Sequence, residues 1–145
     1  MLSSKNKEKI YIKCIESIKS TSESNKLKFI SKLLFESFDN WIFCGFYFQD
    51  NDKLFVSEYS ANKIPCSPIE FNGVCGTAIL KNKILNIEDV NNFQGHIVCD
   101  NDSKSELCIP FDIDGIKYVL DVDSNIYNAF CEIDEKYLVK IIKEF

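Results

Sequence analysis

Asp114-Gly115 is the feature that most constrains the fold, because it separates two runs of strand-like composition. These runs, 106–111 and 117–123, are rich in β-branched, aromatic and other apolar residues. Asp-Gly is a favoured two-residue turn between antiparallel strands. We therefore predict a β-hairpin, and the turn fixes which residues face each other along both strands.

With this turn, Glu106 lies opposite Asp123 and Cys108 lies opposite Asp121. Because side chains alternate between the two faces of a strand, these four residues share one face of the sheet. The opposite face is apolar and is expected to pack on helices. Its residues are Leu107, Ile109, Phe111, Tyr118, Leu120 and Val122.

Three carboxylates therefore meet on one face, those of Glu106, Asp121 and Asp123. Like charges across a strand pair are destabilising, so the acids need a cation or a retained proton. A fully solvated face is the simpler alternative. The cysteine-containing segments earlier in the chain favour a binding site, in which a small ligand bearing an ammonium group would neutralise the acids.

The rest of the chain alternates helical and strand-like patterns. Helices are expected over 5–19 and 26–38, strands over 41–48 and 53–59, a loop over 60–72, a short helix over 73–80, a short strand over 83–87, an irregular region over 88–104, and a final helix capped by Asp134. This order predicts one α+β domain over 1–145, with a mainly antiparallel central sheet flanked by helices.

The composition excludes several classes of partner. With 46% hydrophobic and 27% charged residues, the chain is typical of a soluble globular protein. Its net charge of −5, without a basic stripe, argues against nucleic-acid binding. No apolar run approaches the ~20 residues that span a bilayer, and the charged N-terminus lacks the apolar core of a signal peptide. We therefore expect no membrane association and a cytoplasmic location.

Seven cysteines in such a chain indicate redox, metal or catalytic use rather than a framework of structural disulfides. Three of them are expected in the core: Cys14, which lies on the apolar stripe of the first predicted helix, and Cys44 and Cys131, which have no polar constellation beside them. Three others are candidates for chemistry: Cys66, Cys75 and Cys99. Cys75 falls at the start of a predicted helix, where unpaired N–H groups favour a thiolate.

Cys99 follows the single histidine, His96, in a glycine-containing loop. A zinc site from Cys66, Cys75, Cys99 and His96 lacks the close paired spacing of structural zinc motifs, so no metal is expected. A Cys-His hydrolase would need oxyanion donors where this chain has acids. Thiol redox chemistry fits better: one thiolate attacks, a sulfenic acid forms, and a second cysteine condenses with it.

Five blocks carry a family resemblance: Gly-Val-Cys-Gly-Thr-Ala (73–78), Asp-Val (89–90), Gly-His-Ile-Val-Cys-Asp (95–100), Ser-Lys-Ser-Glu (103–106) and Leu-Asp-Val-Asp-Ser (120–124). In order and spacing they resemble those of the free methionine-(R)-sulfoxide reductases, enzymes built on a GAF-type domain. The likeness covers roughly residues 41–142. It implies reduction of free methionine (R)-sulfoxide, without a cofactor, by cysteines that a thioredoxin-like dithiol recycles.

The resemblance also implies roles. Cys99 matches the cysteine that attacks the sulfoxide, Cys66 the usual resolving cysteine, and Cys75 an auxiliary or alternative partner. The acids that match those holding the substrate amino group and assisting protonation of the leaving oxygen are Glu106, Asp121 and Asp123.

The aromatic wall of the site is expected from Tyr47 and from Trp41 or Phe43, which a regular strand would place on one face. Cys108 is an extra thiol where the family usually has an aliphatic residue. A second copy of the chain is a further partner that the sequence leaves open. The competing functions are a non-catalytic GAF module that binds a small ligand or senses redox state, and a thiol protein that scavenges peroxide.

Overall fold

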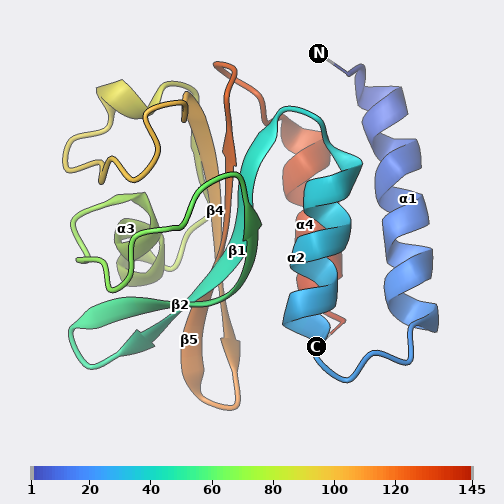
Figure 1. Ribbon diagram of the computed structural model, residues 1–145, viewed down its shortest axis with the longest axis horizontal. Coiled ribbons are helices and arrows are strands. Elements are labelled where there is room, and N and C mark those ends of the chain that lie inside the picture. The colour runs from blue at the N-terminus through green and yellow to red at the C-terminus, as the bar shows by residue number, and fades with distance from the viewer. Residues whose placement is uncertain (1, 145) are drawn as a thin grey trace.

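A computed structural model describes residues 2–144, and its centre is a five-stranded sheet (Figure 1). The strands are β1 (Trp41–Asp50), β2 (Lys53–Ala61), β3 (Leu85–Ile87), β4 (Ser105–Ile113) and β5 (Ile116–Ser124). Their order across the sheet is β2-β1-β5-β4-β3, and every neighbouring pair is antiparallel. The predicted α+β class with a mainly antiparallel sheet is confirmed.

The helices divide unequally between the two faces of the sheet. They are α1 (Ser4–Ser20), α2 (Lys26–Ser37), α3 (Val74–Lys81) and α4 (Glu132–Ile142), with a 3-10 turn η1 at Val90–Asn92. Figure 1 shows α2 and α4 on one face with α1 outside them, and α3 with the long loops on the other. Among the described residues, no helix has the length and apolar character needed to cross a membrane.

The register of the β4–β5 hairpin is the one predicted. Glu106 pairs with Asp123, and Cys108 pairs with Asp121. The turn residues Asp114 and Gly115 have φ angles of +50° and +81°, the left-handed conformation that a two-residue hairpin turn requires. The turn therefore determines which side chains face the helices and which face the loops.

The predicted apolar face of the hairpin packs on the helices. Leu107, Leu120 and Val122 are fully buried there against residues of α1, α2 and α4. Cys14 and Cys44 are buried in the same core, as expected. Cys131 differs from the prediction, because it is only half-buried and occupies the N-cap position of α4.

A buried ion pair fastens α1 to the start of α4. Lys7 Nζ lies 2.6 Å from Asp134 Oδ2 and donates a 2.8 Å hydrogen bond to the carbonyl of Ala129. Tyr11 donates a 2.6 Å hydrogen bond to the other oxygen of Asp134. Asp134 also accepts from the backbone N–H of Cys131, so it caps α4 from the third helical position rather than from the predicted N-cap.

Replacing Asp134 by alanine should lower the free energy of unfolding by about 3–5 kcal/mol, because the Lys7 ammonium would stay buried without its partner. Urea unfolding at neutral pH measures the loss. The control is Asp112→Ala, which removes an exposed ion pair with Lys117 and should cost less than about 1 kcal/mol. Equal losses in the two variants would contradict a structural role for the buried pair.

Candidate functional site

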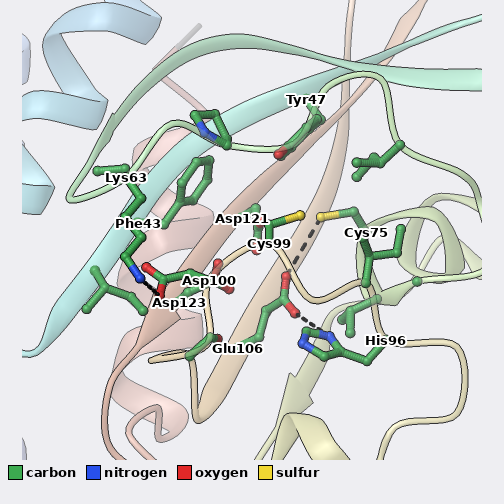
Figure 2. Close-up of a pocket in the computed structure, with 18 of the residues that line it drawn as sticks. Phe43, Tyr47, Lys63, Cys75, His96, Cys99, Asp100, Glu106, Asp121 and Asp123 are labelled. Carbon is green, nitrogen blue, oxygen red and sulfur yellow. Dashed lines mark hydrogen bonds and ion pairs between the residues drawn. The ribbon is translucent and has the colours of Figure 1, made fainter.

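A pocket lies on the face of the sheet that α3 and the long loops cover (Figure 2). Its empty volume is about 640 Å³, the solvent-filled mouth included. The strands β4 and β5 supply its acidic floor, and the loops over 62–73 and 88–104 supply its walls. The acids of the floor face this pocket because the hairpin register turns its polar face away from the helices.

The floor contains the three predicted carboxylates. Glu106 and Asp121 are buried, whereas Asp123 is half-buried with an Oδ1 that is sealed from solvent and has no hydrogen-bond partner among the described residues. Cys108 Sγ lies 3.5 Å from Glu106 Oε2 and 3.5 Å from Asp121 Oδ1. Among residues 2–144, no lysine forms an ion pair with any of these three acids.

Burial and mutual repulsion favour the protonated state of two floor acids. Burial raises the pKa of Glu106 well above its ordinary value, and the charges of Asp121 and Asp123 raise it further. Burial and the charge of Asp121 likewise raise the pKa of Asp123. The floor therefore has two ways to reach a stable state: protons retained by its acids, or a cation in the pocket.

His96 stands beside the floor but does not supply that cation. Its Nδ1 lies 3.9 Å from Glu106 Oε1, and its pKa is lowered because burial disfavours the charged imidazolium. The same nitrogen has no hydrogen-bond partner among the described residues. His96 is thus placed to contact Glu106 as a neutral ring.

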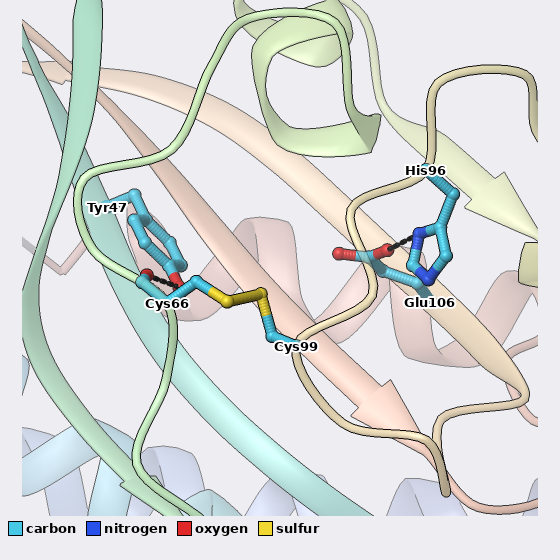
Figure 3. The surroundings of a disulfide bond; sticks show 5 residues. All are labelled: Tyr47, Cys66, His96, Cys99 and Glu106. Atoms are coloured by element: carbon cyan, nitrogen blue, oxygen red, sulfur yellow. Dashed lines mark hydrogen bonds and ion pairs between the residues drawn. A yellow bond between two sulfur atoms is a disulfide. The ribbon is translucent and has the colours of Figure 1, made fainter.

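Cys66 and Cys99 are joined by a disulfide at the rim of the pocket (Figure 3). Their Cα atoms are 5.7 Å apart, although 33 positions separate them in the sequence. Tyr47 on β1 donates a 2.9 Å hydrogen bond to the carbonyl of Cys66 and so ties this loop to the sheet. Of the two cysteines, Cys99 lines the pocket.

Two glycines let the cysteine loops approach each other. Gly95 has a φ of +89°, and a Cβ there would come within 2.4 Å of the carbonyl oxygen of Asn72. A Cβ on Gly73 would meet the side chain of Ile97 at 3.0 Å. Larger residues at these positions would therefore separate the loops that hold Cys66 and Cys99.

Cys75 lies in the first turn of α3, as predicted, but its surroundings do not favour a thiolate. Its Sγ is 3.4 Å from Cys108 Sγ and 3.9 Å from Glu106 Oε2. The hydrogen bond with Cys108 lowers the pKa of Cys75, yet burial and the charges of Asp121 and Asp123 outweigh it and raise the pKa to about 12. The expected activation by the helix N-terminus is therefore overcome by the acidic floor.

The two aromatic candidates on β1 lie on opposite faces of the sheet. Phe43 lines the pocket together with Tyr47, whereas Trp41 is buried in the helix-face core, where it stacks on Phe38 at 4.4 Å. The prediction that Trp41 shares a face with Phe43 is wrong because of a β-bulge. Trp41 pairs with Ser124 and Phe43 with the adjacent Asp123, so two residues of β1 advance against one residue of β5.

Sequence reasoning missed two features of this region. Lys63 lines the pocket and pairs with Asp100 at 3.3 Å, although nothing in its sequence surroundings distinguishes it from the other lysines. The contact between Cys75 and Cys108 also went unpredicted, since it depends on where α3 docks on β4.

Comparison with known proteins places the chain among relatives of similar length. It is 45% identical over 115 residues to Protein YtsP of Bacillus subtilis (strain 168), an alignment that covers 76% of this chain and 69% of the relative. It is 38% identical over 116 residues to the free methionine-R-sulfoxide reductase of Escherichia coli (strain K12), covering 79% and 70%. No protein-family model matches the chain.

Solved structures agree with the sequence relatives. The free methionine-R-sulfoxide reductase from Neisseria meningitidis, solved in complex with its substrate, superposes with a TM-score of 0.85 at 28% identity, covering 99% of this chain and 89% of that one. Structures described as GAF proteins superpose as well. The chain therefore belongs to the family of free methionine-R-sulfoxide reductases and has the GAF fold.

Proposed function

We propose that this chain reduces free methionine (R)-sulfoxide to methionine, with Cys99 as the attacking thiolate and Cys66 as the resolving cysteine. The observation that carries the proposal is the Cys66–Cys99 disulfide at the rim of a pocket floored by Glu106, Asp121 and Asp123. Two cysteines that can form a disulfide can reduce an oxidant, and the acidic floor beside them can bind its positive charge. The pocket therefore suits a small zwitterionic oxidant. Passive ligand binding would need no such pair.

The floor acids would bind the substrate amino group. A methionine sulfoxide ammonium bears three N–H donors and one positive charge, so it would supply both the hydrogen bonds and the cation that the floor lacks. The unpartnered Oδ1 of Asp123 is a ready acceptor. Phe43 and Tyr47, which line the same pocket, would contact the methyl sulfoxide end.

The reaction then balances with two thiols. Cys99 thiolate attacks the sulfoxide sulfur and the oxygen takes a proton. The hydroxyl then moves to the Cys99 sulfur as the new sulfur–sulfur bond breaks, which releases methionine and leaves Cys99 as a sulfenic acid. Cys66 thiolate attacks the Cys99 sulfur, the hydroxyl takes a proton and leaves as water, and the disulfide forms. Two electrons pass from the two thiols to one sulfoxide.

Glu106 would supply the proton to the oxygen. Its raised pKa keeps it protonated at a pH where an ordinary glutamate is ionised, and it reaches into the pocket beside Cys75 and His96. A thioredoxin-like dithiol would then reduce the disulfide. Cys66 and Cys99 are both only half-buried, so a protein reductant can approach them.

Replacing Cys99 by serine should abolish methionine formation, because the attacking sulfur is gone. Replacing Cys66 by serine should leave a single turnover per chain but no sustained turnover with thioredoxin, since the sulfenic acid has no partner. Methionine released per chain, measured with each sulfoxide epimer separately, distinguishes the two variants.

The matched control is Cys14→Ser, which removes a buried thiol on the helix side of the sheet. It should lose one titratable thiol without changing the yield of methionine. Sustained turnover by Cys99→Ser, or equal activity on both epimers of the sulfoxide, would contradict the proposal.

Replacing Asp123 by asparagine should raise the KM for methionine sulfoxide by roughly 10–100-fold with a smaller effect on kcat, because a charge-assisted hydrogen bond to the ammonium is lost. Asp102→Asn is the control, since Asp102 is exposed and outside the pocket. For a substrate analogue without the amino group, the KM should be high and the same with wild type and with Asp123→Asn. An unchanged KM for the amino acid in Asp123→Asn would rule out the ammonium contact.

Replacing Glu106 by glutamine should stabilise the fold, and more so as the pH rises. The pKa of Glu106 is raised in the folded state, so below its unfolded pKa of about 4.3 the carboxyl is protonated in both states and the free energy of unfolding does not change with pH. Between the unfolded and the folded pKa, the wild type loses at most about 1.4 kcal/mol of this free energy per pH unit, and the glutamine variant does not. Urea unfolding from acidic to neutral pH measures the difference between variant and wild type. Asp112→Asn controls for the loss of one negative charge. A difference that is flat with pH would show that Glu106 carries no retained proton.

A further inference from the structure

Four side chains under the pocket place their donor atoms around one point. Cys75, Glu106, Cys108 and Asp121 are all buried, and one ligand atom from each lies within 4.8 Å of all the others. Two are thiols from different elements, α3 and β4, and two are carboxylates from β4 and β5. Figure 2 shows Cys75 directed toward Glu106.

Four of the six separations between these donor atoms are close to the edges of a tetrahedron around a zinc ion, and the other two are no longer than 4.8 Å. With Zn–S of about 2.3 Å and Zn–O of about 2.0–2.2 Å, a tetrahedral site has a sulfur–sulfur edge of about 3.8 Å and sulfur–oxygen edges of about 3.5–3.7 Å. The sulfur atoms of Cys75 and Cys108 are 3.4 Å apart. Three sulfur–oxygen edges, two from Cys108 and one from Cys75, measure 3.5, 3.5 and 3.9 Å.

The donor set selects among metals. Two sulfur and two oxygen donors in tetrahedral array suit Zn²⁺, whereas Mg²⁺ and Ca²⁺ require six or more oxygen donors. An ion can reach the four donors, because Cys75, Glu106 and Asp121 line the pocket. Electrostatics favour a cation as well, since among residues 2–144 no lysine pairs with Glu106 or Asp121.

We propose that Cys75, Glu106, Cys108 and Asp121 form a binding site for one Zn²⁺ ion per chain. Binding displaces the protons of the two thiols and the proton that Glu106 retains, and it leaves Cys66 and Cys99 untouched. This set differs from the group of Cys66, Cys75, Cys99 and His96 that the sequence disfavours. Cys108, the thiol that the family resemblance leaves without a role, becomes a metal ligand.

The site has a consequence for catalysis, and this consequence rests on the proposed function. Zinc would engage two of the three carboxylates that are proposed to hold the substrate ammonium. Zinc and methionine sulfoxide should then compete, and the reductase should be inhibited by zinc in a manner that excess substrate relieves. Binding of the metal itself does not depend on the enzyme being a reductase.

Zinc affinity of the untagged, reduced chain tests the site directly, by competition with a chromophoric chelator. We expect one equivalent per chain, with at least ~100-fold weaker binding in Cys108→Ala and in Cys75→Ala. Cys14→Ala, which removes an equally buried thiol elsewhere, should bind like wild type. Circular dichroism and thermal melting identify any variant that fails to fold, and only folded variants are compared.

Two further arms identify the ligands. The double variant Cys66→Ser, Cys99→Ser should keep full affinity, and loss of binding there would assign the metal to the disulfide cysteines and overturn the proposal. Cobalt(II) added to this double variant should give thiolate charge-transfer and tetrahedral d–d bands, and these should disappear in Cys108→Ala. Absence of zinc binding by wild type, or wild-type affinity in both Cys75→Ala and Cys108→Ala, would also overturn it.

The proposed zinc site and the proposed function can be disproved independently of each other. If the chain binds zinc as described but does not reduce methionine sulfoxide, the proposed function is wrong and the metal site stands. If it reduces the sulfoxide but does not bind zinc, the metal site is wrong and the function stands. For an active, zinc-binding chain, inhibition by zinc should raise the apparent KM and leave kcat unchanged; the same inhibition in Cys108→Ala would contradict the site.

Discussion

The register of the β4–β5 hairpin is the constraint on which the rest of the molecule depends. The left-handed turn at Asp114-Gly115 sets it, and alternation then sends Leu107 and Val122 to the helices and Glu106 and Asp123 to the pocket. A shift of one residue would exchange these sets, burying acids among the helices and exposing the core. The same backbone geometry therefore determines both the composition of the core and the composition of the site.

One face of the sheet carries the candidate site, and the other face carries the core that stabilises the fold. The pocket face gathers carboxylates and thiols whose charged forms are unfavourable, which works against folding. The helix face carries the large core and the buried Lys7–Asp134 pair, which hold the sheet in place. Such a separation lets the site keep groups at raised pKa without unfolding the domain.

Features encoded by local residues could be predicted from the sequence, and features created by docking or irregularity could not. The hairpin register follows from a two-residue turn and strict alternation, so the acidic face was foreseeable. The prediction for Trp41 is wrong because β1 has a bulge at Ile42, and no glycine or proline in the sequence marks this irregularity. The contact of Cys75 with Cys108 depends on how α3 lies on β4, and the position of Lys63 depends on the path of a loop.

The disulfide between Cys66 and Cys99 also restricts the conformations of the unfolded chain. It closes a ring that contains α3, β3 and part of each wall of the pocket, and its two ends have a sequence separation of 33. Closing a ring of this length removes conformational freedom from the unfolded chain worth about 3–4 kcal/mol in the simplest entropic treatment. In the proposed mechanism, part of the oxidising power of each substrate molecule is thus converted into resistance to unfolding, and the protein is least stable in the reduced state that awaits its substrate.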